Sequence, residues 1–302
     1  MDEDMSTERT GFIGLGQMGS GIALNMLKNT GSLMVIDRNT QAVARLVDVG
    51  ATACRDVADL ASKCDLIFLC LPFTPEVREV IFSDHGIVPH CRPGLTIIDT
   101  TTLDRNDAVS IGGELQEINI DYWDCPVSGL PARAQEGSLT VMFGGSDEAY
   151  AKHQLYLQSF SSFMVHAGPL GCGQAMKAIN NIIYNINIAA LCEILPLAVA
   201  SGLDPDELAR VVTSASARSF AAEHFVPKMR ARIFDGDFPM QAAQKDIDNV
   251  QRMVDEFGVH LPLFNAMTED YQSAIDAGDG GDAKSSMLKV FERALGVSFG
   301  DQ

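Results

Sequence analysis

A lysine followed closely by two asparagines opens the longest apolar segment of the chain. The stretch GCGQAMKAINN runs from Gly171 to Asn181 and places Asn180 and Asn181 three and four residues after Lys177. In a helix, side chains at these spacings share one face. The lysine could transfer a proton while the amides orient a substrate. One alternative is that Lys177 is a surface lysine at a helix start. Asn181 could instead simply bond to the backbone or to a neighbouring helix.

Proton transfer by Lys177 near neutral pH requires a lowered pKa. The apolar residues Ile179, Ile182 and Ile183 surround the lysine in sequence, and we expect them to bury it. Asn180 is uncharged, so it could orient a carboxylate or a hydroxyl group without restabilising the ammonium form. Lys177 is therefore a candidate general acid and base for a reaction such as alcohol oxidation.

A glycine-rich turn near the N-terminus predicts a dinucleotide site. GFIGLGQMGSGIALNML contains G-x-G-x-x-G between an apolar strand pattern and a helical pattern. The glycines permit a tight turn and a close approach of the backbone to a pyrophosphate, while the helix N-terminus attracts the negative charge. The predicted contact residues are Gly14, Leu15, Gly16, Gln17, Met18 and Gly19.

The acidic residue expected after this motif bears on the choice between NAD and NADP. Asp37 follows Gly19 by eighteen residues, at the end of the next strand pattern. Its carboxylate could accept hydrogen bonds from both ribose hydroxyls, which favours NAD, whereas Arg38 could reach a 2′-phosphate and keeps NADP open. FAD is disfavoured, because FAD enzymes carry further motifs that are not evident here.

The first half of the chain has the pattern of a parallel sheet, which would position the glycine turn and Asp37. Apolar runs (GFIGLG, LMVID, LIFLCLP, LTIIDTT, DYWDCPV and LTVMFGG) alternate with helical patterns, which indicates a parallel sheet covered on both faces. After about residue 167 the pattern is helical, beginning with a long helix over 173–201. We therefore predict an α/β Rossmann-type domain over 1–167 and an all-helical domain over 168–302.

Turns after two of the apolar runs are expected at the ligand-binding edge of this sheet. CLPFTPE contains Leu71, Pro72 and Glu76, and DTTT ends at Thr102. Ligands of open α/β sheets bind beyond the carboxyl ends of the strands. The threonines could equally well cap their turn.

Composition excludes several classes of partner. The net charge of −18 argues against nucleic acid or anionic membranes, so a small anionic substrate needs a site of locally placed basic groups and amides. The seven cysteines and six histidines show no metal spacing, and we expect free thiols and no metal. The acidic N-terminus has no apolar core typical of a signal peptide, which favours the cytoplasm.

One segment, INNIIYNINIAALCEILPLAVASGL, is long enough to cross a membrane. Four asparagines, Glu193 and Pro196 interrupt it, and a bilayer tolerates such groups poorly. We therefore expect a long helix buried inside a soluble protein rather than a membrane span.

Four motifs together resemble the β-hydroxyacid dehydrogenase family, which includes 3-hydroxyisobutyrate dehydrogenase and relatives of 6-phosphogluconate dehydrogenase. They are GFIGLGQMG, DCPVSG with EGSLTVMFGG, GCGQAMKAINN and QKDIDN, in that order along nearly the whole chain. The resemblance implies an NAD(P)-dependent enzyme acting on a small carboxylate, with the long helix joining its two domains. It also implies a homodimer or homotetramer formed through the helical domain.

The resemblance assigns roles to particular residues. Lys177 matches the catalytic lysine and Asn180 a substrate-binding asparagine, with Asn181 beside it. Ser128 and Gly129 match the loop that holds the substrate carboxylate. Cofactor contacts are implied for Leu71, Pro72, Glu76, Thr102 and Lys245, with Asp246 next to the last.

The chain departs from the family where PVSGLP has Leu130 in place of a glycine. A leucine at this turn would reshape the pocket, so 3-hydroxyisobutyrate, tartronate semialdehyde, L-serine, threonate and longer hydroxy-diacids all stay open as substrates. An imine reductase on the same fold is an alternative, although such enzymes usually carry another residue in place of Lys177. A non-catalytic assembly protein is a second alternative, and it would be expected to lose the lysine.

Overall fold

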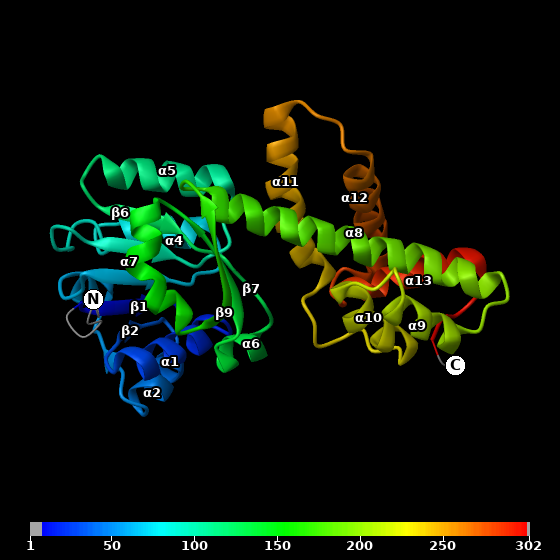
Figure 1. Cartoon of the computed structure of the whole chain (residues 1–302), viewed down its shortest axis with the longest axis horizontal. Coiled ribbons are helices and arrows are strands. Elements are labelled where there is room, and N and C mark those ends of the chain that lie inside the picture. Colours follow the sequence, from blue (N-terminus) through cyan, green and yellow to red (C-terminus); the bar gives the residue numbers. More distant parts are fainter. Residues whose placement is uncertain (1–7, 301–302) are drawn as a thin grey trace. The chain divides into compact units, whose positions relative to one another are not determined.

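The chain divides into two compact units in the computed structural model, which describes residues 8–300 (Figure 1). The units are Met1–Lys177, built on a β-sheet, and Ala178–Gln302, which is helical. The division falls ten residues after the predicted boundary at residue 167, because helix α8 (Cys172–Ala200) begins in the first unit and continues into the second.

The first unit contains a nine-stranded sheet with the order β3-β2-β1-β4-β5-β6-β8-β7, and β9 pairs with β8. The strands are β1 (Thr10–Ile13), β2 (Met34–Ile36), β3 (Thr52–Ala53), β4 (Leu66–Leu69), β5 (Thr96–Asp99), β6 (Asp121–Asp124), β7 (Val127–Ser128), β8 (Leu139–Gly144) and β9 (Ser161–Gly168). The six strands from β3 to β6 are parallel, and the order reverses between β1 and β4. This is the doubly wound arrangement that the alternating sequence pattern predicted.

Beyond β6 the sheet differs from the prediction. The run DYWDCPV forms two strands, β6 and β7, which Cys125 and Pro126 separate, and β8 pairs antiparallel with both. The expected all-parallel sheet is therefore mixed. β9 was not among the predicted strands, because its sequence SSFMVHAG lacks a long apolar run.

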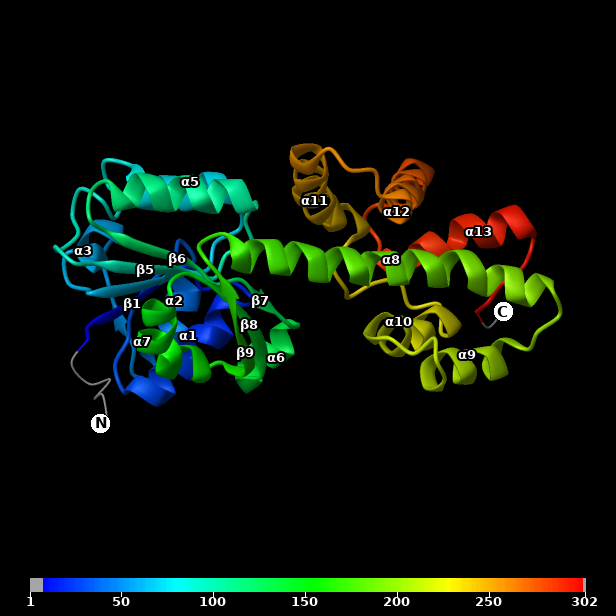
Figure 2. The same ribbon diagram turned by 45° about the horizontal axis from the view of Figure 1, so that its top comes forward.

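Helices cover both faces of the sheet (Figure 2). They are α1 (Gly19–Thr30), α2 (Thr40–Val47), α3 (Val57–Ala61), α4 (Thr74–Phe82), α5 (Arg105–Gln116), α6 (Pro131–Glu136) and α7 (Asp147–Gln158). Neighbouring strand residues alternate between the two cores: Phe12 packs on the side of α1 and α7, whereas Ile13 packs on the side of α4 and α5. Burial of both faces explains why the strands are continuously apolar.

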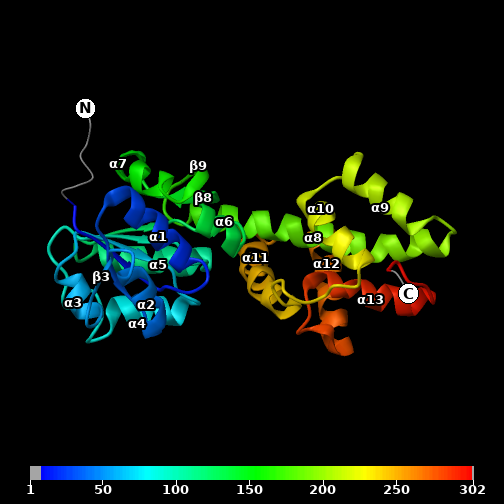
Figure 3. The ribbon, with the colours of Figure 1, turned by 90° about the horizontal axis from the view of Figure 1, so that it is seen from below.

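The second unit packs its helices around the C-terminal part of α8 (Figure 3). They are α9 (Pro205–Ser214), α10 (Phe220–Arg230), α11 (Ala243–Phe257), α12 (Pro262–Ala274) and α13 (Leu288–Leu295). A short 3₁₀ turn, Lys284–Met287, precedes α13. Ile188 and Cys192 of α8 are fully buried in the core of this unit.

Helix α8 is only partly buried. Its most apolar window has a mean hydropathy of 1.8, sufficient by length and composition for a membrane span, and 39% of that window is buried. Ile183, Ile194 and Leu197 are 56%, 53% and 49% exposed in the single chain. The helix expected to be buried is therefore exposed on this face, which presents an apolar surface.

Candidate active site

The glycine turn has the geometry that a dinucleotide requires. Gly14 adopts a φ of +100°, and a Cβ at this position would collide with the carbonyl oxygen of Cys70. A Cβ on Gly19 would collide in the same way with the carbonyl oxygen of Gly14. Gly16 differs, because a Cβ there meets no atom within 4 Å, so this face of the turn is open. Among the described residues, no side chain caps the start of α1, and a helix N-terminus of this kind favours a phosphate, although the Ser20 N–H already donates to the Gly16 carbonyl at 3.0 Å.

Asp37 connects the glycine turn to the end of β2. Its Oδ2 accepts a hydrogen bond from the backbone N–H of Leu15 at 2.5 Å, and its Oδ1 accepts one from Asn39 at 2.6 Å. Each carboxylate oxygen retains a second acceptor position, as contact with ribose hydroxyls would require. Arg38 is exposed next to it. The residues of the turn thus fit the adenosine half of NAD(P).

Two further strand ends lie at the same edge of the sheet. The Thr101 hydroxyl accepts a hydrogen bond from the backbone N–H of Leu71 at 2.9 Å, which joins the turns after β4 and β5. Pro72 is exposed and Thr102 is half-buried beyond these bonds. Glu76 lies in the first turn of α4, and its Oε2 is buried with no hydrogen-bond partner among the described residues.

The start of α8 is fixed to the first unit by two side chains. Asp124, fully buried at the end of β6, accepts hydrogen bonds from the backbone N–H groups of Gly171 and Gln174, both at 2.7 Å. The Gln174 amide donates to the Thr101 carbonyl at 2.7 Å and accepts from the Leu103 N–H at 2.9 Å. The first turn of α8 is therefore held at the carboxyl edge of the sheet.

Burial raises the pKa of Asp124 to about 6, and the two N–H donors oppose that shift. The close fit around this carboxylate also explains a glycine of GCGQ, because a Cβ on Gly173 would lie 2.7 Å from Asp124 Oδ2. Asp124 and Gln174 were not singled out from the sequence. The available signal was that both lie inside the motifs DCPVSG and GCGQAMKAINN.

Lys177 is half-buried one turn after Gln174. Asn180 follows it on the same helix, is exposed, and donates to Asn181 Oδ1 at 3.3 Å. The expected apolar enclosure of the lysine is only partly present. Ile182 is 5% exposed, but Ile179 is 44% exposed, because it points away from the packed face of α8. The prediction that all three isoleucines bury Lys177 is therefore wrong in the single chain.

The predicted carboxylate loop follows β7. Ser128 is half-buried and pairs with Thr140 of β8, and Gly129 adopts a φ of +143°, which only glycine adopts without strain. Leu130 then forms the N-cap of α6 and is half-buried. The departure from the family pattern therefore lies at the start of a short helix.

Lys245 and Asp246 lie in the first turn of α11, in the second unit. Lys245 is half-buried, whereas Asp246 is buried, and its Oδ1 accepts a hydrogen bond from Asn181 Nδ2 at 3.0 Å. The structure thus brings together Asn181, which was predicted to bind the substrate, and Asp246, which was predicted to lie at the cofactor.

The cysteines are free thiols, as their scattered spacing predicted. Across residues 8–300, no three His, Cys, Asp or Glu side chains are grouped so that they could hold a metal ion.

Comparison with known proteins identifies the family of the chain. Residues 9–168 match the NAD binding domain of 6-phosphogluconate dehydrogenase, and residues 171–291 match the NAD-binding region of NADP-dependent 3-hydroxyisobutyrate dehydrogenase. The chain is 33% identical to 2-(hydroxymethyl)glutarate dehydrogenase of Eubacterium barkeri, over 96% of this chain and 97% of that protein. It is 32% identical to a probable mitochondrial 3-hydroxyisobutyrate dehydrogenase of Dictyostelium discoideum, over 91% and 88% of the two chains.

A solved structure has the same fold over nearly the whole chain. The 3-hydroxyisobutyrate dehydrogenase of Salmonella typhimurium superposes with a TM-score of 0.82 at 28% identity, covering 94% of this chain and all of that one. The chain belongs to the β-hydroxyacid dehydrogenase family. It is an NAD(P)-dependent oxidoreductase of the class that acts on CH–OH groups.

Proposed function

We propose that the enzyme interconverts a small β-hydroxy acid and its semialdehyde or keto acid, with Lys177 as general acid and base. The anchoring of α8 carries this proposal. Asp124 and Gln174 fix the turn before Lys177 at the carboxyl edge of the sheet, and the glycine turn follows β1 at that same edge. Open α/β sheets bind their ligands there.

The chemistry needs a group that exchanges a proton with the substrate oxygen. NAD(P), when bound, would supply the acceptor for the hydride that leaves the carbon carrying the hydroxyl group. Neutral Lys177 accepts the hydroxyl proton in this direction, and its ammonium form returns the proton to the developing alkoxide in the reverse direction. Ser128 and the N–H of Gly129 bind the carboxylate, and the Asn180 amide orients the substrate beside the lysine.

The proposed cofactor preference is NAD. The Asp37 carboxylate would repel a 2′-phosphate, while the exposed Arg38 offsets this repulsion in part. The other proposed contacts are the glycine turn, Leu71, Pro72, Glu76 and Thr102. The roles of Lys245 and Asp246 at the cofactor rest on the resemblance and stay predictions.

A panel of substrates tests this function. The purified enzyme is assayed with NAD⁺ and NADP⁺ against 3-hydroxyisobutyrate, L-serine, threonate and a longer 2-(hydroxymethyl) diacid. The semialdehydes are assayed in reverse, and a cyclic imine serves as the control. We expect cofactor reduction with at least one hydroxy acid, faster with NAD⁺, and no turnover of the imine. Turnover of the imine alone, or of no panel member while the cofactor binds, would refute the proposal.

We further propose a soluble, cytoplasmic homodimer or homotetramer. The exposed apolar side chains Ile183, Ile194 and Leu197 on α8 support it, because so much apolar surface on one helix is typical of a subunit interface. Light scattering of protein purified without detergent is expected to give two or four times the monomer mass. A monomer, or a requirement for detergent, would contradict this assembly.

A further inference from the structure

A buried polar cluster lies in the core of the helical unit, and the proposed reaction gives no role to its lysine. It consists of Lys284, Asp246, Asn185 and Tyr271, whose exposed fractions are 7%, 9%, 0% and 1%. A lysine is rarely buried to this extent unless it is paired. The cluster therefore requires an explanation that packing alone does not provide.

The ammonium group of Lys284 has three partners in this cluster. Its Nζ donates to Asn185 Oδ1 at 2.9 Å and lies 3.9 Å from Asp246 Oδ2. It also lies 5.6 Å from the centre of the Tyr184 ring. Burial lowers the pKa of Lys284, and the charge of Asp246 acts in the opposite direction. The Lys284 ammonium and the Asp246 carboxylate thus lie within ion-pair distance of each other in the core.

The second oxygen of Asp246 connects this pair to Asn181. Asp246 Oδ1 accepts the hydrogen bond from Asn181 Nδ2 at 3.0 Å. An ionised carboxylate only accepts hydrogen bonds, so the amide of Asn181 must turn its NH₂ group toward Asp246. The Oδ1 of Asn181 is then directed away from the carboxylate, and it accepts from Asn180 at 3.3 Å.

We propose that Lys284 is a positioning residue, which holds Asp246 and thereby fixes the amide orientation of Asn181 next to the substrate. This inference rests on the proposed function, because it takes Asn180 and Asn181 as substrate-binding residues. Lys284 itself touches no substrate. Without its positive charge, Asp246 would be a buried and poorly compensated anion, which would move toward water and release Asn181.

A double-mutant cycle in kcat/KM tests the connection. Lys284→Met, Asn181→Ala and the double variant are compared with wild type, using the best panel substrate and correcting for the fraction of native protein. Lys284→Met is expected to lower kcat/KM for the hydroxy acid about tenfold, the effect of one lost orienting hydrogen bond. In the Asn181→Ala background the same change is expected to have little further effect, because the amide that it positions is gone.

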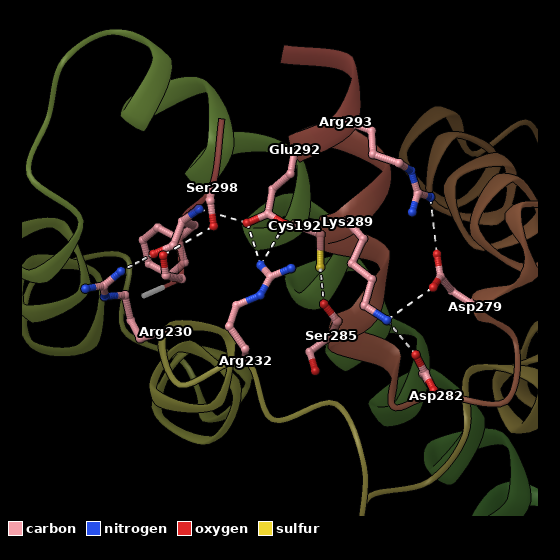
Figure 4. Close-up of polar contacts among 12 residues, drawn as sticks. Cys192, Arg230, Arg232, Asp279, Asp282, Ser285, Lys289, Glu292, Arg293 and Ser298 are labelled. Atoms are coloured by element: carbon pink, nitrogen blue, oxygen red, sulfur yellow. Dashed lines mark hydrogen bonds and ion pairs between the residues drawn. The ribbon is translucent and has the colours of Figure 1, made fainter. Parts of the chain in front are cut away.

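Lys289→Met is the matched control. Lys289 is five residues away, and its ammonium pairs with Asp282 at 2.6 Å and Asp279 at 3.2 Å (Figure 4). Its loss removes a cation from the same segment without touching Asn181, so kcat/KM is expected to be unchanged. If Lys284→Met fails to fold, Lys284→Gln retains a donor for Asn185 and removes only the charge.

A second readout does not depend on activity. The side-chain amide resonance of Asn181, assigned by its loss in Asn181→Ala, is followed by NMR. Lys284→Met is expected to shift this resonance upfield as its hydrogen bond to the carboxylate is lost, and Lys289→Met is expected to leave it in place. The positioning role would be overturned if Lys284→Met left the Asn181 resonance unshifted. It would also be overturned if Lys284→Met lowered kcat/KM equally in wild type and in Asn181→Ala. If wild type turns over no panel member, the proposed function fails, and the NMR result still decides the role of Lys284.

Discussion

Replacing Lys177 with alanine is expected to lower kcat about a thousandfold, the effect typical of removing a general acid or base. The lysine is half-buried one turn after Gln174, whose backbone N–H donates to Asp124 at the sheet edge, and it is the group proposed to exchange the proton with the substrate. Affinity for NAD⁺ is expected to stay within a few-fold of wild type, because the predicted cofactor contacts lie elsewhere. Steady-state kinetics and cofactor titration by fluorescence measure both quantities.

Lys177→Arg distinguishes the loss of proton transfer from the loss of the positive charge that could attract the substrate carboxylate. Arginine keeps the positive charge that could attract a carboxylate, but its pKa is too high for it to release a proton. We therefore expect Lys177→Arg to be nearly as inactive as Lys177→Ala while retaining more of the substrate affinity. A rate close to wild type in either variant would contradict the assignment of Lys177 as the proton-transfer group.

Replacing Gly16 with alanine is expected to weaken NAD⁺ binding about a hundredfold without destabilising the fold. A methyl group at this position meets no protein atom within 4 Å, so it would not strain the fold. It would instead obstruct a cofactor bound against this turn. Keeping a pyrophosphate from the backbone would remove hydrogen bonds to charged oxygens, together about 3 kcal/mol or a hundredfold in Kd. Cofactor titration and thermal unfolding of the same sample measure the two effects.

Gly14→Ala is the control that distinguishes lost cofactor affinity from lost stability. Gly14 has a φ of +100°, and its Cβ would collide with the Cys70 carbonyl oxygen, so this variant is expected to unfold at a lower temperature as well. Unchanged NAD⁺ affinity in Gly16→Ala would mean that the dinucleotide does not lie against this turn.

Features set by short-range chemistry were predictable from the sequence. The glycine turn depends on three residues within six positions, and the alternating apolar runs predicted the parallel core of the sheet. The long helix was predicted at 173–201 and is observed as Cys172–Ala200, because its sequence is apolar over a long stretch and the glycines of GCG mark its start. Such signals are local, and the structure confirms them.

Features set by long-range pairing were not predictable in this way. Asp124 contacts Gln174 from 50 positions away, and Lys284 contacts Asn185 from 99 positions away. No periodicity in a single sequence connects such residues. Hydrophobicity likewise could not show which isoleucines of α8 are buried, since Ile182 and Ile183 are identical in type and differ only in the face on which they lie. The antiparallel pairing of β8 also depends on a break at Pro126 that composition alone left open.

The most direct test of the proposed reaction follows the hydride itself. Each hydroxy acid of the panel is prepared with deuterium on the carbon that carries the hydroxyl group, and the reduced cofactor is analysed by mass spectrometry after turnover. We expect the reduced nicotinamide to gain the deuterium from the accepted substrate. Reduced cofactor without deuterium, or bound cofactor that stays oxidised with every β-hydroxy acid, would contradict hydride transfer from a hydroxy acid as the function of this protein.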